Sequence, residues 1–524
     1  MFIDAKTLSG HTAVDVDVCV VGAGAAGISI ARELSGTGLR VGLFESGGLE
    51  PDRRTQALYR GSSDDLYSLP LDESRFRYFG GSTNRWAGWC RPLDQIDFER
   101  RDWIPDSGWP FGRQELETYY ARASVICRAD RPAPPETLTD WPLDPEKISI
   151  AEFRLSPPIS FGTVYREELR GSRNVTVYLN ANASGFSRRE NGRIDHISFR
   201  TLNGRSLNVT SRVFILAAGG IENPRLLLSS AADPARAIGN DYDLVGRYYM
   251  DHPALFSGLI SPTTLCPPTR FFTTEHVANP GKATTRTGGF AIAEATLRRE
   301  GLAGAVVRFV PRPRYSTQTR WDKPATASAR RLLQSITRRQ IPDHLAAHIE
   351  RASTGALTAA SAFSAAAAHR VRPRWTLALR TWVESLPRPN NRVTLSARRN
   401  PLGPVAHVTW ETGEAEKASV VRLHQLLGDE LERRRFARID PVMKSVADDW
   451  PATQAGASHH MGTTRMHDSE RRGVVDRNCR VHGCDNLFVA GSSVFPTSGY
   501  ANPTLTIVAL AVRLADFVKQ ATSR

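Results

Sequence analysis

The feature that most constrains the fold is a glycine-rich turn between two apolar segments close to the start of the chain. An alternating apolar run over residues 16–21 leads into the turn Gly22-Ala23-Gly24-Ala25-Ala26-Gly27. A stretch with helical character extends to about Gly36, and a second apolar run from Arg40 to Phe44 ends at Glu45. Strand, glycine turn, helix and strand in this order are typical of a dinucleotide-binding unit on a parallel sheet, although a glycine turn can also be purely structural.

The residue types in this turn suit a pyrophosphate. Gly22 permits the tight turn, Gly24 lets the backbone approach a phosphate, and Gly27 lets the helix pack on the strand. A helix that starts near Ala25 and Ala26 adds free amide donors and the positive end of its dipole. We expect these five residues to contact the cofactor.

Glu45 follows Gly22 by 23 residues and stands at the end of the second strand. A carboxylate at this place accepts hydrogen bonds from ribose hydroxyls and repels a 2′-phosphate. The sequence therefore predicts a dinucleotide that carries no 2′-phosphate.

Composition places the chain among soluble globular proteins. It has 524 residues, of which 41% are hydrophobic and 23% charged, so we expect two to four structural units and no wholesale disorder. No run of eighteen apolar residues and no export signal is visible, so no transmembrane segment is expected. Six cysteines spread over this length favour reduced thiols and a cytoplasmic location.

The net charge of +14 comes mostly from one segment. Between Arg308 and Arg380 fourteen lysines and arginines stand against three acidic residues. Within it, residues 327–340 place Leu332, Leu333 and Ile336 on one face of an amphipathic helix. A solvated helix face is the favoured interpretation, and a peripheral membrane surface or an acidic partner is the alternative. A nucleic-acid-binding module is a third possibility, but the segment shows no recognised motif and little aromatic interleaving, so no nucleic acid is expected as a partner.

Other segments indicate how the rest of the chain is organised. Short β-rich runs from Val175 to Asn208, separated by Asn-Gly dipeptides, predict an antiparallel meander. A further strand over residues 213–216 enters the small-residue turn 217–220. From about 253 to 450 the chain becomes rich in proline, alanine and arginine, which indicates a separate lobe.

The last hundred residues carry the densest group of motifs. Ser458-His459-His460-Met461-Gly462-Thr463 is followed by a short strand over residues 486–489 that reaches Gly491-Ser492. Asn502-Pro503-Thr504 then opens an apolar helix that runs to about Lys519, with Asn at the predicted cap and Pro at the first helical position. The N-terminus of such a helix stabilises an anion, such as a reduced flavin.

These segments together resemble the glucose-methanol-choline (GMC) oxidoreductases, a family of FAD enzymes, and its bacterial sugar- and alcohol-oxidising branch. The matches cover the first glycine motif, Gly80-Gly81-Ser82-Thr83, residues 217–224 and the run from His459 to Thr506. The resemblance implies an α/β (overall α+β) architecture. A Rossmann-type FAD-binding domain (residues 1–110, 165–252 and 455–524) would be interleaved with a substrate domain of antiparallel sheet plus helices (residues 111–164 and 253–454).

The same resemblance implies positions around the FAD. Glu45 would hold the adenosine ribose, Ala183 would lie near the adenine, and residues 81–84 would lie along the flavin. The full set expected to bind FAD is Gly22, Gly24, Ala25, Ala26, Gly27, Glu45, Gly80, Gly81, Ser82, Thr83, Asn84, Ala183, Ala218, Gly491, Ser492, Asn502, Pro503 and Thr504. Some relatives, such as pyranose 2-oxidase, attach FAD to a histidine after the double glycine. Residues 84–86 offer none, so noncovalent FAD is expected.

The family pattern His-x-x-Gly-Thr fits His459 as the catalytic base, and the second catalytic position falls on Asn502. A neutral imidazole suits removal of a hydroxyl proton near pH 7 while a hydride leaves the carbon. For His460 and His252 a structural role is favoured. Cys479, His482 and Cys484 lack a second ligand pair, so no metal is expected.

The sequence thus predicts FAD-dependent oxidation of an alcohol, with a sugar or glycoside as the favoured substrate. Oxygen or a soluble quinone-type molecule would accept the electrons, because no iron-sulfur motif is visible. The alternatives are a non-redox hydroxynitrile-lyase-type member of the family and oxidation of a non-sugar alcohol.

Overall fold

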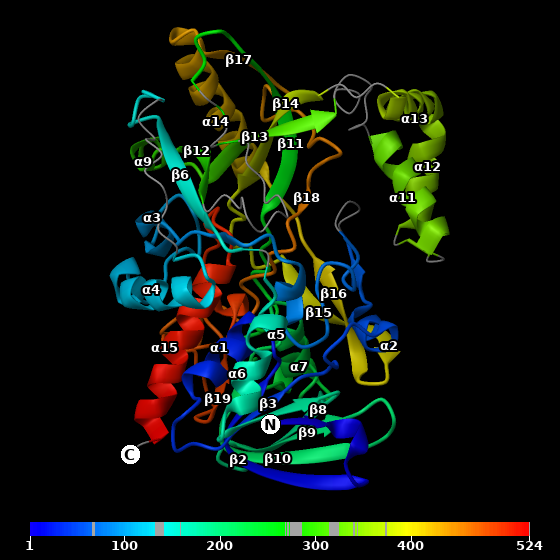
Figure 1. Ribbon diagram of the computed structural model, residues 1–524, viewed down its shortest axis with the longest axis vertical. Coiled ribbons are helices and arrows are strands. Elements are labelled where there is room, and N and C mark those ends of the chain that lie inside the picture. Colours follow the sequence, from blue (N-terminus) through cyan, green and yellow to red (C-terminus); the bar gives the residue numbers. More distant parts are fainter. Residues whose placement is uncertain are drawn as a thin grey trace.

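The computed structural model describes residues 1–64, 69–130, 141–157, 159–267, 269, 272, 286–313, 324–338, 341–342, 344–371 and 375–522. Two large sheets lie at opposite ends of the long axis (Figure 1). The chain passes between them several times, so segments from both ends of the sequence meet where the sheets approach each other. Parts of the basic segment, including the end of the amphipathic helix predicted over 327–340, fall outside the described residues.

The first sheet is built around the glycine turn. Its order is β1-β7-β3-β2-β10-β9-β8, with β19 beside β10. The strands are β1 (Phe2–Asp4), β2 (His11–Val21), β3 (Val41–Phe44), β7 (Val175–Leu179), β8 (Asn182–Arg188), β9 (Ile194–Arg200), β10 (Ser206–Leu216) and β19 (Leu487–Val489). Strands β1, β7, β3, β2, β10 and β19 are parallel, whereas β8 and β9 form an antiparallel meander with β10.

Residues 18–21 of β2 are all buried, as expected for a parallel strand covered on both faces. Helices pack around this sheet, and α15 contacts both α1 and α4 (Figure 1). The helices of this part are α1 (Ala25–Glu33), α4 (Glu117–Ile126), α5 (Phe161–Val164), α6 (Arg166–Gly171), α7 (Glu222–Leu228) and α15 (Thr504–Thr522). The strand, turn, helix and strand predicted for the N-terminus are present.

The second sheet is antiparallel, in the order β17-β11-β14-β13-β12-β6-β5, with β18 beside β11. Its strands are β5 (Trp89–Cys90), β6 (Ile148–Leu155), β11 (Pro253–Pro262), β12 (Arg286–Ile292), β13 (Ala305–Pro313), β14 (Trp375–Val383), β17 (Ala437–Pro441) and β18 (Ala455–Gly456). Helix α14 (Glu414–Arg433) covers one face and forms an apolar core with residues such as Phe309 and Leu379. The opposite face holds Phe153, Trp89 and Trp382 and contacts Tyr500 of the C-terminal segment.

Two further groups of elements complete the described part of the chain. A small sheet joins β15 (Arg392–Asn400), β16 (Gly403–Thr409) and β4 (Ser62–Ser63). Helices α11 (Pro324–Arg338), α12 (Leu345–Thr354) and α13 (Ala356–Val371) pack on one another at the side of the second sheet (Figure 1). Short helices α2 (Arg53–Gln56), α3 (Gln95–Phe98) and α9 (Glu294–Glu300) lie in connecting segments. Among the described residues, no helix combines the length and the apolar character needed to cross a bilayer.

Packing shows where the expected domain segments lie. Helix α4, in the segment expected to bind substrate, contributes Tyr120 and Ala123 to the apolar core of the first sheet. Strands β15 and β16, also expected in that domain, pair with β4 of the N-terminal segment. The two-domain boundaries themselves stay a prediction.

Candidate active site

A cavity of about 550 Å³ lies between the glycine turns of the first sheet and the polar face of the second. The residues lining it come from widely separated parts of the sequence. Those that the sequence singled out and that line it are Gly22, Gly24, Ala25, Ala26, Glu45, Gly81, Ser82, Thr83, Ala183, Ala218, His459, Gly491, Ser492, Asn502, Pro503 and Thr504. The fold therefore gathers most of the predicted site around a single cavity.

The glycine turn has the shape of a cradle for a dinucleotide. Gly22 has a φ of +104°, and a Cβ there would stand 2.7 Å from the carbonyl oxygen of Ala217. At Gly24, by contrast, a Cβ would meet no atom within 4 Å, so the missing side chain leaves open space toward the cavity. The same is true of Gly219 and Gly491, which approach from the other side. This open backbone surface fits a pyrophosphate that needs close approach to amide groups.

Three predicted cofactor residues stand behind the lining. A Cβ on Gly27 would lie 1.9 Å from the carbonyl oxygen of Gly22, so this glycine lets α1 pack against the turn. Gly80 has a φ of +100° and turns the chain before Gly81. The Asn84 side chain donates to the carbonyl of Phe79 at 3.0 Å, within its own loop.

Glu45 is buried at the end of β3 and holds the glycine turn in place. Its carboxylate accepts from the backbone N–H of Ala23 at 2.9 Å and of Gly47 at 2.8 Å. Burial raises the pKa of this carboxyl, while the hydrogen bonds from Gly47 and Ala23 oppose that shift. The carboxylate also lines the cavity, so it can receive ribose hydroxyl groups there.

Three side chains form a hydrogen-bonded row that ends at the cavity. His252 lies at the start of β11, and its Nε2 is 2.8 Å from the carbonyl oxygen of Gly499. Its Nδ1 is 2.9 Å from Nδ1 of His459, and Nε2 of His459 is 3.2 Å from Nδ2 of Asn502.

The protons in this row follow from its fixed end. Burial lowers the pKa of His252 to about 4, so its ring is neutral at pH 7. A carbonyl oxygen can only accept, so His252 carries its proton on Nε2 and presents a lone pair at Nδ1. His459 must then donate from Nδ1, which leaves Nε2 unprotonated, and the Asn502 amide donates to it. The row therefore presents a basic nitrogen to the cavity.

The backbone around His459 is fixed by Asp251. One carboxylate oxygen accepts from the N–H of His459 at 2.8 Å and the other from the N–H of Ser458 at 3.0 Å. Ser458 itself has a φ of +63°. Burial, together with His252 and His460, holds the pKa of His459 well below its usual value. The imidazole is thus neutral over the physiological range.

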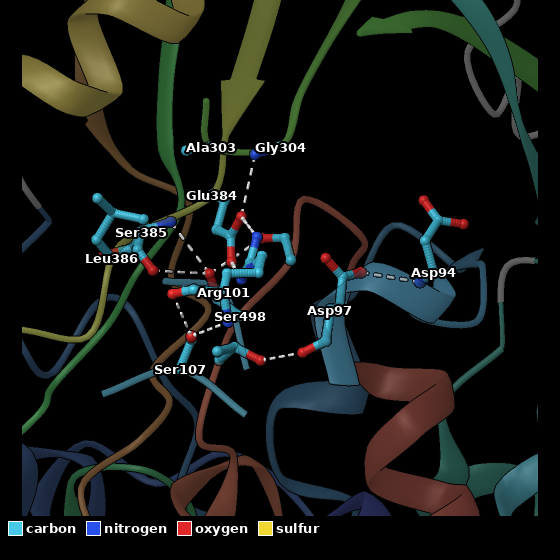
Figure 2. A network of polar contacts seen from close by, with 12 residues as sticks. Asp94, Asp97, Arg101, Ser107, Ala303, Gly304, Glu384, Ser385, Leu386 and Ser498 are labelled. Atoms are coloured by element: carbon cyan, nitrogen blue, oxygen red, sulfur yellow. Dashed lines mark hydrogen bonds and ion pairs between the residues drawn. The ribbon is translucent and has the colours of Figure 1, made fainter. Parts of the chain in front are cut away.

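The loop that carries Gly499 and Asn502 is held from the second sheet (Figure 2). Arg101 and Glu384 form a buried ion pair with two hydrogen bonds, of 2.8 and 2.5 Å. Next to Glu384, the N–H of Ser385 donates to Oγ of Ser498 at 3.0 Å. This network positions the carbonyl of Gly499 that orients His252.

The structure differs from the sequence prediction at the start of the last helix. α15 begins at Thr504, so the carbonyl of Pro503 accepts the first helical bond, from Ile507 at 2.9 Å. Asn502 is not the helix cap, because its side-chain amide contacts His459 instead.

Sequence reasoning favoured a structural role for both other histidines, and the structure separates them. His252 contacts His459 directly, whereas the ring of His460 stacks near Tyr249 and lines the cavity. Trp86 and Trp89, which the motifs did not mark as site residues, also line the cavity. The adjacency of Asp251 and His252 was the available signal, but only the fold brings them to His459.

Two family models match the chain. The model of the FAD dependent oxidoreductases covers residues 17–375, and that of the GMC oxidoreductase C-terminal domain covers residues 387–511. Together they include both the glycine turn and the His459 and Asn502 region.

Individual relatives agree with these models. The chain is 29% identical to the fructose dehydrogenase large subunit of Gluconobacter japonicus over 330 residues, which are 62% of this chain and 50% of that subunit. It is 39% identical to a C-glycoside 3-oxidase of Microbacterium trichothecenolyticum over 108 residues, 20% of this chain and 18% of the oxidase. The matches thus span half or less of these two relatives.

A solved structure shares the fold. Pyridoxine 4-oxidase from Mesorbium loti superposes with a TM-score of 0.55 at 17% identity, covering 97% of this chain and 99% of that one. The comparisons confirm the family resemblance, the α/β fold class and the FAD cofactor predicted from the sequence. The chain belongs to the FAD-dependent oxidoreductases and carries the C-terminal domain of the GMC oxidoreductases.

Proposed function

We propose that the protein oxidises the hydroxyl group of a small alcohol, with a sugar or glycoside as the favoured class, to a carbonyl. The observation that carries this proposal is the unprotonated Nε2 of His459 at the cavity, held by His252 on one side and Asn502 on the other. A base in this state can take the hydroxyl proton without first losing one of its own.

When bound, FAD supplies the two-electron acceptor to which the carbinol carbon gives its hydride. The substrate loses one proton and one hydride, which together account for the two electrons of the oxidation. His459 receives the proton at Nε2. The depressed pKa of His459 makes it a weak base, so proton transfer has to accompany hydride loss, which makes the hydroxyl more acidic.

Asn502 has the second role in the proposal. Its Nδ2 lies 3.2 Å from Nε2 of His459, so its amide can also donate to a substrate oxygen placed beside that nitrogen. That contact would orient the hydroxyl lone pairs and leave its proton directed at His459. After proton transfer, the Nδ1–H of His459 remains bonded to His252.

The glycine cradle supports the expected placement of FAD. Gly24, Ala25 and Ser492 line the part suited to a diphosphate, and Glu45 faces the place of a ribose. Residues 84–86 contain no histidine, which supports noncovalent binding. Trp86 and Trp89 add flat apolar surfaces on which a sugar ring can pack.

The relatives named for fructose and C-glycosides support a sugar substrate, and those named as oxidases support oxygen as acceptor. A soluble quinone-type molecule is the other acceptor consistent with direct transfer.

The test is an anaerobic screen of alcohols and sugars against the purified holoenzyme, followed by loss of the oxidised flavin absorbance and then by admission of oxygen. Wild-type protein should be bleached by at least one sugar. The His459→Ala variant should retain FAD and be reduced roughly 10²- to 10⁴-fold more slowly, the range typical of a lost general base. The His460→Ala variant should lose much less. If no alcohol bleached the flavin while a cyanohydrin was cleaved, the lyase alternative would replace this proposal.

A further inference from the structure

A second cavity, of about 330 Å³, adjoins the active-site cavity. Leu69 and Ala457 line both, and Ala457 precedes His459 by two residues. The second cavity lies between the second sheet and the helices α11 and α12. Its volume is in the range of sites for small molecules.

The lining of this cavity is strongly basic. Arg312 and Arg380 come from the second sheet, and Arg330 and Arg331 come from α11. Among the described residues that line it, none is acidic. The described lining thus combines four guanidinium groups with apolar and neutral polar side chains.

The sheet places its arginines on the side that faces the active site. Side chains alternate along a strand, so Leu379 and Val383 point into the core under α14 while Arg380 and Trp382 point the other way. The guanidinium carbons of Arg312 and Arg380 lie 3.9 and 5.2 Å from the centre of the same ring, Phe256. Two like charges are therefore held together on one apolar platform.

The row of arginines continues toward the first cavity. Arg308 pairs with Arg380 across β13 and β14, and its guanidinium lies 4.0 Å from the ring centre of Trp89. Trp89 lines the active-site cavity. Cationic side chains thus follow one sheet face from the place of the reacting hydroxyl to the second cavity.

Helix α11 supplies the opposite wall. Ala327, Arg330, Arg331 and Gln334 recur at intervals of three and four residues, so they share one helix face, and all four line the cavity. Beneath them His348 is buried, and burial together with Arg331 lowers its pKa to about 4. The histidine is neutral at pH 7, and the charge of this wall comes from the arginines.

We propose that this arginine-lined cavity binds an anionic group carried by the substrate. Guanidinium groups pair with the planar or tetrahedral oxygens of carboxylate, phosphate and sulfate, often through two hydrogen bonds. Because the cavity joins the active site just before His459, a molecule with its hydroxyl at His459 can place a charged substituent among the four arginines. The inference rests on the proposed function and narrows it to acidic or phosphorylated hydroxyl compounds, such as sugar acids.

The experiment measures binding to the holoenzyme by equilibrium dialysis, with D-glucuronate, D-glucose 6-phosphate and D-glucose as probes and with inorganic phosphate as a competitor. At least one anionic sugar should bind about ten-fold or more tightly than D-glucose, as one or two charged hydrogen bonds imply. Stronger binding of D-glucuronate would identify a carboxylate site, and stronger binding of the phosphate ester a phosphoryl site. Phosphate alone should displace either sugar.

Variants locate the effect. Replacing Arg330 and Arg331 together by glutamine should remove the preference for the anionic sugar, and Arg331→Lys should keep most of it. The matched control is Arg351→Gln, which removes an exposed arginine of α12 that is outside the cavity lining and should leave the preference unchanged. FAD content shows that each variant is folded.

Equal binding of neutral and anionic sugars by the wild type would overturn the inference. So would equal losses of preference in the Arg330 and Arg331 double variant and in Arg351→Gln. These outcomes concern binding alone and leave alcohol oxidation untouched. If no hydroxyl compound reduced the flavin while anionic sugars still bound selectively, the proposed function would fail and the anion site would stand.

Discussion

Replacing His252 by leucine tests whether the histidine row sets the protonation state of the base. In the wild type, Nδ1 of His252 accepts the proton on Nδ1 of His459 at 2.9 Å. Leucine removes that acceptor and keeps an apolar side chain of moderate size. His459 is then free to carry its proton on Nε2, which points at the cavity, and in this tautomer it cannot accept a hydroxyl proton.

The magnitude follows from the cost of the lost partner. A buried N–H without an acceptor costs about 1–3 kcal/mol, and the other tautomer avoids that cost. At an RT of about 0.59 kcal/mol, this shifts the balance of tautomers by about 5- to 150-fold. The rate of flavin reduction at saturating substrate should fall by the same factor. His252→Asn, whose carbonyl oxygen can take the place of Nδ1, should lose less.

The assay is anaerobic stopped-flow reduction of the bound flavin, with FAD content and melting temperature measured for each variant. A purely structural role for His252 predicts that the leucine and asparagine variants slow in proportion to their loss of stability. The reasoning is refuted if the leucine variant keeps its FAD and reduces it at the wild-type rate. It is also refuted if the two variants are equally slow at equal stability.

Four further predictions follow from the site and its support. FAD should be released by acid or heat denaturation, and flavin that stays with the precipitated chain would contradict noncovalent binding. Gly24→Val should fold with wild-type circular dichroism but without FAD, because a side chain there enters open space; retention of FAD would move the diphosphate elsewhere. Glu384→Gln should lower the free energy of unfolding in urea by about 3–5 kcal/mol, because Arg101 would remain buried without its carboxylate, whereas replacing both by apolar residues should restore stability; unchanged stability in the single variant would argue against this. Stability should fall as the pH drops from about 6.5 toward 4, because burial lowers the pKa of His252 and His424 to about 4 and the unfolded chain takes up protons first; a His424→Gln variant should decline less steeply, and a flat wild-type profile over this range would be inconsistent with neutral buried histidines.

Much of the fold could be predicted from local patterns. The N-terminal strand, turn and helix, the meander from Val175 and the strand from Trp375 to Val383 all occur where the sequence places them. Apolar periodicity and glycine positions determine such elements over short distances. The packing of α4 on the first sheet and the pairing of β15 and β16 with β4 were missed, because contacts between distant segments leave no local pattern.

The sequence by itself determined the glycine cradle, the cofactor class and the two residues, His459 and Asn502, that meet at the cavity. Motifs of this kind are short, and their backbone requirements are met within a few residues. Only the tertiary structure decided that His252 orients His459, that Arg101 and Glu384 hold the loop of Gly499, and that four arginines surround a second cavity. Each of these depends on side chains some hundreds of residues apart in sequence or on opposite walls of a cavity. Their distances are determined by how the two sheets and their helices pack, and residue type or spacing along the chain does not encode them.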